Sequence, residues 1–210
     1  MASGMLPQHE GLRATTRLGF LATTGENAQT WEWLVLIGAG MTAAVASTFL
    51  DFNLRIPGHA ILQVVVPIAA GLAIVPRRNA GTFMGLTALI TKLGLRLSGF
   101  GGDGLSLGAM TSLTATGPLL DWTLRRNQGG WLLYLNFALA GLMSNLLALF
   151  VRGAAKLTGF EHASGRPLAA WLAQASVTYV VCGLLAGLVS GMLWFYGTKR
   201  HQSAMPREAP

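Results

Sequence analysis

The stretch WLLYLNFALAGLMSNLLALFV, residues 131–151, decides the fold class of this chain. It contains no charged side chain, and a helix of this length, rising about 1.5 Å per residue, crosses the roughly 30 Å hydrocarbon core of a bilayer. It begins at Trp131 and is followed directly by Arg152, the flanking pattern of a membrane span. The stretch therefore predicts a transmembrane helix.

Five further apolar segments predict an all-α integral membrane bundle of about six transmembrane helices. Their approximate ranges are 33–50, 60–75, 80–95, 105–124 and 168–196. The segments at 60–75 and 80–95 fall short of the usual ~20 residues, so we expect them to tilt, to thin the bilayer or to end inside the protein. The bundle would occupy residues 33–197, between a polar, poorly ordered tail at 1–32 and a cytoplasmic tail at 198–210.

The composition of the whole chain agrees with a membrane protein. Only 11% of its 210 residues are charged, 52% are hydrophobic, and the mean hydropathy is +0.49. A soluble domain carries about 25% charged residues, so an ordinary water-soluble enzyme is excluded, and so is a disordered body. The single cysteine, Cys182, excludes a disulfide framework and a cysteine metal site.

The basic residues indicate the orientation of the bundle. The net charge is +7, but the charges stand at the ends of apolar segments and form no continuous stripe, which argues against nucleic acid as a partner. One side would carry Arg13, Arg17, Arg77, Arg78, Arg125, Arg126, Lys199, Arg200 and Arg207, and the other Arg55, Arg96, Arg152, Lys156 and Arg166. The positive-inside rule then predicts that both termini lie in the cytoplasm, in a multi-pass protein of the cell (inner) membrane.

With this orientation, polar residues gather at the external end. The candidate contacts of a small-molecule ligand are Arg55, His59, Gln63, Lys92, Asn145 and Gln174. Pro57 and Gly58 place His59 at the opening of a helix, where unpaired backbone N–H groups favour an anion. Arg55 and Lys92 also suit an anionic group.

Structural roles remain open for several polar residues. Arg55 would equally serve as a solvated loop charge, Lys92 could extend to the headgroups, and Asn145 could join two helices by hydrogen bonds. For Asp121, we expect an ion pair with Arg125, four residues further along the same helix.

Small residues at four-residue spacing predict where helices approach closely. Such stripes are Gly183, Gly187 and Gly191; Gly81 and Gly85; and Ala39 and Ala43 beside Gly40 and Ala44. Each stripe favours packing within the chain. The alternative is that one of them docks a partner membrane subunit, and the stripe of Ala39, Gly40, Ala43 and Ala44 is the candidate.

The sequence favours no enzyme and no cofactor. The four histidines lie in tails or loops, so the run Gly187–Gly191 with Ser190 lacks a general base. No helix carries a pair of carboxylates, the histidines form no metal-ligand cluster, and no phosphate-binding loop is present. The chain is therefore not expected to drive transport by itself.

Four short motifs add a family resemblance. The runs IPGH at 56–59, GTFMGLT at 81–87, GPLLD at 117–121 and SNLLA at 144–148, together with six short helices, resemble the S components of energy-coupling factor transporters. This resemblance implies a vitamin- or metal-binding membrane subunit whose ligand site faces outside. It also implies that small residues of the first helix, here Ala39 and Ala43, contact a transmembrane coupling subunit, which two ATPases power. The cobalt and nickel members have a histidine directly after the initiating methionine, whereas Ala2 follows Met1 here, which argues against a metal.

These observations predict a membrane-embedded, substrate-binding subunit of an uptake transporter for a small, vitamin-like solute. The alternative is a non-catalytic accessory subunit packed against a larger membrane complex. A solitary channel or exchanger is less favoured, because the helices lack the repeated rings of charge that line selective pores.

Overall fold

The computed structural model describes residues 7–21, 28–50, 58–100, 107–125, 130–159 and 168–195, and its regular elements in these ranges are all helical. The elements are α1 Glu10–Arg13, the 3-10 turn η1 Gly19–Leu21, α2 Ala28–Phe49, α3 Ile61–Ile74, α4 Ala80–Leu97, α5 Leu107–Leu124, α6 Trp131–Leu157 and α7 Leu168–Trp194. The all-α class predicted from the sequence is confirmed. Each of the six long helices lies over one of the predicted apolar segments.

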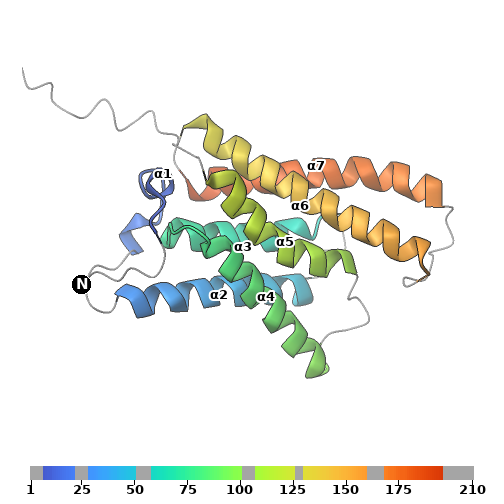
Figure 1. Cartoon of the computed structure of the whole chain (residues 1–210), viewed down its shortest axis with the longest axis horizontal. Coiled ribbons are helices and arrows are strands. Elements are labelled where there is room, and N and C mark those ends of the chain that lie inside the picture. Colours follow the sequence, from blue (N-terminus) through green and yellow to red (C-terminus); the bar gives the residue numbers. More distant parts are fainter. Residues whose placement is uncertain are drawn as a thin grey trace, which may run out of the picture.

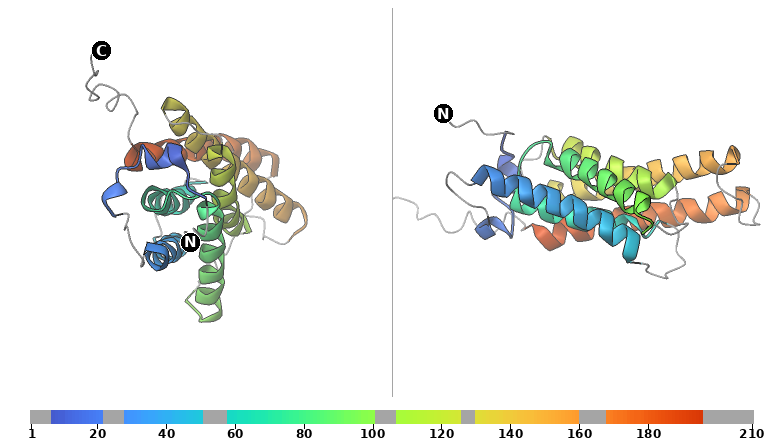
Figure 2. Two further views of the ribbon diagram at one scale, coloured as in Figure 1. Left: turned by 60° about the vertical axis from the view of Figure 1, so that its left-hand side comes forward. Right: turned by 90° about the horizontal axis from the view of Figure 1, so that it is seen from below.

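The six long helices run back and forth along one common direction, with α2, α4 and α6 opposed to α3, α5 and α7 (Figure 1). The shortest of them, α3, contacts α2, α4, α5, α6 and α7 and lies between α2 and α7 when the bundle is viewed from its end (Figure 2). Nine of its 14 residues are buried. At about 21 Å long, α3 is a buried central helix, which explains its nearly uninterrupted apolar sequence.

Glycines allow two helix pairs to pack backbone against backbone. A Cβ added at Gly187 of α7 would lie 2.0 Å from the carbonyl oxygen of Phe137 in α6. A Cβ added at Gly117 of α5 would lie 2.1 Å from the carbonyl oxygen of Gly81 in α4. Gly183 likewise approaches the backbone of α6 at Gly141. The stripes on α7 and α4 therefore pack within the chain.

The stripe predicted to dock a partner also faces the interior, which corrects that prediction. Ala43 and Ala44 are fully buried, and Gly40 is buried against α4, where an added Cβ would lie 2.6 Å from the carbonyl oxygen of Met84. Ala39 is half-buried beside Gly71 of α3. Small-residue spacing identifies a close-packing face, but it does not distinguish a neighbouring helix of the same chain from a partner.

One end of the bundle is covered by residues 7–18, which we call the strap (Figure 1). The amide of His9 donates to the carbonyl of Pro76 (2.8 Å), and the amide of Arg17 donates to that of Trp194 (3.0 Å). Leu12 of the strap is 1% exposed and belongs to the main core. The boundary predicted at residue 32 thus differs from the structure, in which α2 begins at Ala28 and the strap packs on the bundle.

Three of the described helices contain a stretch long and apolar enough to cross a membrane: Gln29–Phe49, Trp131–Leu157 and Trp171–Trp194. Large apolar side chains also cover the outside of the bundle, among them Ile90 (69% exposed), Phe150 (73%) and Val177 (64%). Contiguous exposed apolar surface of this kind requires a lipid or protein environment. Both features are those of a membrane protein.

Candidate functional site

Buried polar side chains collect at the end of the bundle opposite the strap, which we call the far end. Lys92 hydrogen-bonds to the last turn of α2, and Gln63 to the residue directly after it. The side-chain amide of Gln63, in the first turn of α3, donates to the carbonyl of Leu50. The ammonium of Lys92, on α4, donates to the hydroxyl of Ser47 (3.0 Å) and to its carbonyl (3.4 Å). Because Lys92 is only 5% exposed, its ammonium group does not extend to the headgroups.

Asn145 of α6 lies at the same end and is 2% exposed. Its side-chain NH₂ group donates to the carbonyls of Tyr179 in α7 (2.6 Å) and of Gly58 (3.4 Å). Gly58 has a φ of +89°, a conformation that glycine adopts without a steric penalty. It directly precedes His59, which is half-buried. Asn145 therefore joins two helices and also fixes the turn that presents His59.

The structure brings four of the six predicted ligand contacts, His59, Gln63, Lys92 and Asn145, to the far end. Arg55 lies outside the described residues. Gln174 is exposed on α7, whereas Gln63, Lys92 and Asn145 are buried. Its position in an apolar helix did not reveal which face it occupies.

Two far-end residues, Arg152 and Tyr179, were not predicted from the sequence. Tyr179 is 4% exposed, and its hydroxyl accepts a hydrogen bond from the guanidinium of Arg152 at 3.4 Å. Arg152 follows Asn145 by seven residues, two helical turns, so the two share one face of α6. That spacing is the signal that could have linked them.

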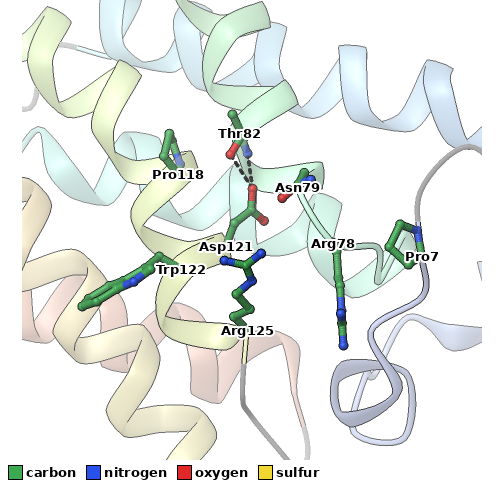
Figure 3. A pocket seen from close by; sticks show the side chains of 8 residues that line it. All are labelled: Pro7, Arg78, Asn79, Thr82, Pro118, Asp121, Trp122 and Arg125. Atoms are coloured by element: carbon green, nitrogen blue, oxygen red, sulfur yellow. Dashed lines mark hydrogen bonds between the residues drawn. The ribbon is translucent and has the colours of Figure 1, made fainter.

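A pocket of about 330 Å³ lies at the strap end (Figure 3). We call it the strap-end pocket; it is lined by Pro7, Arg78, Asn79, Thr82, Pro118, Asp121, Trp122 and Arg125. From the sequence, Arg78 and Arg125 were identified only as charges at helix ends. That they line one pocket could not be predicted, because it depends on how α4 and α5 pack.

Asp121 at this pocket holds the start of α4. Its carboxylate accepts hydrogen bonds from the amides of Gly81 (3.1 Å) and Thr82 (2.6 Å) and from the hydroxyl of Thr82 (2.6 Å). The first amides of a helix have no partner within the helix, and a negative charge there interacts favourably with the positive end of the helix dipole. The ion pair predicted between Asp121 and Arg125 is wrong, because the two described side chains form none and the carboxylate bonds to α4 instead.

The chemistry available in the described part of the chain is hydrogen bonding and charge. No group of three His, Cys, Asp or Glu side chains there is placed to hold a metal ion. Ser190, the serine in the glycine-rich part of α7, is fully buried and donates to the carbonyl of Ala186 at 2.7 Å. In comparisons with known proteins, no protein-family model, curated protein or solved structure matches this chain.

Proposed function

We propose that the chain is a six-span membrane subunit that binds a small solute at its far end, as the substrate-binding part of an uptake transporter. The observation that carries this proposal is a pair of hydrogen bonds from buried side-chain amides to Leu50 and Gly58, the described residues on either side of Arg55 in the sequence. The amide of Gln63 donates to the carbonyl of Leu50, and the amide of Asn145 donates to the carbonyl of Gly58, directly before His59. Binding residues commonly lie on loops that a rigid scaffold positions.

The burial of Lys92 at the same end supports this proposal. Ionisable groups inside a membrane bundle are costly and usually mark a functional site. A cationic group at the end of the bundle that also carries His59 suits a solute with a carboxylate or phosphate group.

The distribution of charge supports an external position for the far end. At the strap end, the described basic residues are Arg13, Arg17, Arg77, Arg78 and Arg125. The positive-inside rule places this end in the cytoplasm, and six spans would then return both termini to that side. Under this proposal the strap closes the cytoplasmic end, while the far end, which carries His59, faces the incoming solute.

Solute extraction tests the binding proposal. The protein would be purified from its native membrane in mild detergent and denatured, and the released small molecules would be identified by mass spectrometry. We expect His59→Ala to lower the recovered solute by about tenfold, because one hydrogen bond to a charged ligand is lost. The variant should remain folded.

Gln8→Ala is the control, because this exposed residue lies in the strap, at the opposite end of the bundle. It should retain the solute at the wild-type level. If no small molecule is enriched with the wild-type protein, or if His59→Ala retains it fully, the binding proposal fails.

The outward face of α2 is the revised candidate for docking a coupling subunit. Gly38 and Thr42 are exposed and one turn apart, and nothing lies within 4 Å of a Cβ added at Gly38. The hydroxyl of Thr42 donates to the carbonyl of Gly38 within the helix (2.8 Å), so this face presents a small, internally satisfied surface. Such surfaces allow close helix association in membranes.

We expect Gly38→Leu to lower the amount of coupling subunit and ATPases recovered with the chain by about tenfold, because the leucine would separate the two helices. Gly153→Leu on α6 is the control, since its added Cβ also meets nothing within 4 Å. Mass spectrometry of the complexes purified in mild detergent measures both. Recovery of the wild-type chain in a larger membrane complex without ATPases would instead establish an accessory subunit.

A further inference from the structure

We propose that the strap-end pocket binds a phosphate group, supplied by the headgroup of an anionic phospholipid in the cytoplasmic leaflet. This site is separate from the solute site at the far end. Its volume of about 330 Å³ lies at the lower end of the roughly 300–1,000 Å³ of small-molecule sites. It is therefore suited to a headgroup or a small phosphate ester and too small for a large cofactor.

The charge of the pocket favours an anion. Two arginines line it, Arg78 and Arg125, against the single carboxylate of Asp121, so the lining keeps a net positive charge. The carboxylate oxygens of Asp121 already accept three hydrogen bonds from the start of α4. Planar guanidinium groups bind phosphate oxygens through paired, charge-assisted hydrogen bonds.

The neighbouring Arg77 shows the contrast. Its guanidinium forms an ion pair with Glu32 at 2.8 Å, whereas neither Arg78 nor Arg125 has a carboxylate partner among the described residues. Both Arg78 and Arg125 are exposed. Figure 3 shows the guanidinium of Arg125 beside Asp121, whereas the side chain of Arg78 extends in the opposite direction on the side toward Pro7. The two arginines thus line one pocket from different sides, and neither forms an ion pair within the described part of the chain.

Two further lining groups complete a binding surface. Asn79 has a φ of 64°, and its side chain does not cap α4, so its amide is available as a neutral donor. Pro7 of the strap forms one wall, which is held in place by the hydrogen bond from the amide of Arg78 to the carbonyl of Pro7 (2.9 Å). The pocket is therefore assembled from the strap, the α3–α4 turn and the end of α5.

The position of the tryptophans identifies the source of the phosphate as a lipid. Trp122 lines the pocket and is 62% exposed. Two further exposed tryptophans lie at the same end of the bundle: Trp131 (70% exposed) begins α6, and Trp31 (41%) lies near the start of α2. Exposed tryptophans at helix ends lie at headgroup depth in membrane proteins. The pocket would therefore open where phospholipid phosphates are most concentrated, and basic residues on the cytoplasmic side attract anionic lipids.

Native mass spectrometry of the full chain in detergent tests this site. Phosphatidylglycerol and phosphatidylcholine would be titrated separately, and glycerol 3-phosphate and inorganic phosphate would be added as soluble competitors. For the wild-type protein we expect one phosphatidylglycerol to bind about tenfold more tightly than phosphatidylcholine. The variant carrying both Arg78→Gln and Arg125→Gln should lose that preference.

Arg13→Gln is the matched control, because it removes one positive charge from the same end outside the pocket, where Arg13 bonds to Gln8 at 2.7 Å. It should bind phosphatidylglycerol as the wild type does.

If soluble glycerol 3-phosphate or inorganic phosphate binds to the wild type but phosphatidylglycerol does not displace it, the phosphate site stands and its lipid source is wrong. Equal binding of both lipids to the wild-type protein, with no binding of either soluble phosphate, would overturn the site even if the double variant did not fold. If Arg13→Gln lost the preference for phosphatidylglycerol to the same extent as the double variant, the preference would come from general charge attraction, and the proposed site would be wrong.

Discussion

Replacing Gly187 with leucine is expected to lower the free energy of unfolding by more than about 3 kcal/mol, because overpacking a rigid helix contact forces the backbones apart. The Cβ alone would lie 2.0 Å from the carbonyl oxygen of Phe137 and 2.6 Å from its carbonyl carbon. These are backbone atoms of α6, so no side-chain rotation can relieve the overlap. The α6–α7 pair would have to separate along its length.

The measurement is unfolding of the purified protein by sodium dodecyl sulfate in mild detergent, followed by helical circular dichroism. Gly153→Leu introduces the same side chain into α6, where an added Cβ meets nothing within 4 Å, and should change stability by less than about 0.5 kcal/mol. If Gly187→Leu unfolded at the same detergent fraction as this control, the close contact between α6 and α7 would be wrong.

Replacing Asp121 with alanine is expected to destabilise the bundle by about 2–3 kcal/mol, since charged capping bonds at a helix start are lost together. The amides of Gly81 and Thr82 would lose their acceptor, and α4 would lose its link to α5 at the strap end. Asp121→Asn should cause a smaller loss, because the asparagine keeps one carbonyl acceptor but has no charge.

A double-mutant cycle with Thr82→Val distinguishes this cap from a general effect on α5. The hydroxyl of Thr82 bonds to the same carboxylate at 2.6 Å, so the two substitutions should be non-additive by about 1 kcal/mol. The same unfolding titration measures all four proteins. Additive losses would mean that Asp121 and Thr82 stabilise the bundle independently.

The positions of the helices could be predicted from the sequence because apolar runs are local features. The segment predicted at 80–95 became Ala80–Leu97, and that at 60–75 became Ile61–Ile74. The largest difference is in α6, which continues past Val151 to Leu157. Arg152 bonds to the hydroxyl of Tyr179, and the ammonium of Lys156 lies 4.1 Å from the ring centre of Trp171, so α7 supplies partners that let the charged turn remain helical.

The directions of individual side chains could not be predicted, because they depend on contacts between distant segments. Asp121 was expected to bind the nearest arginine along its helix, yet its partners are about 40 residues away on α4. Ala43 and Ala44 were the candidate face for docking a partner, as the alternative to packing within the chain, and they contribute to the core of their own chain. The buried amides of Gln63 and Asn145 were recognised as unusual, whereas their roles at either end of residues 51–57 required the packed helices.

The strap has a consequence for the order in which the protein is built. Its residues leave the ribosome before any of the long helices, but the amide of Arg17 bonds to Trp194, at the end of the last one, and its guanidinium to the carbonyl of Phe195. His9 similarly contacts the carbonyl of Leu124, 115 residues away. Contacts so distant in sequence form late, because long loops must close first. The strap, although synthesised before the six long helices, therefore reaches its final position only after α7 has been inserted.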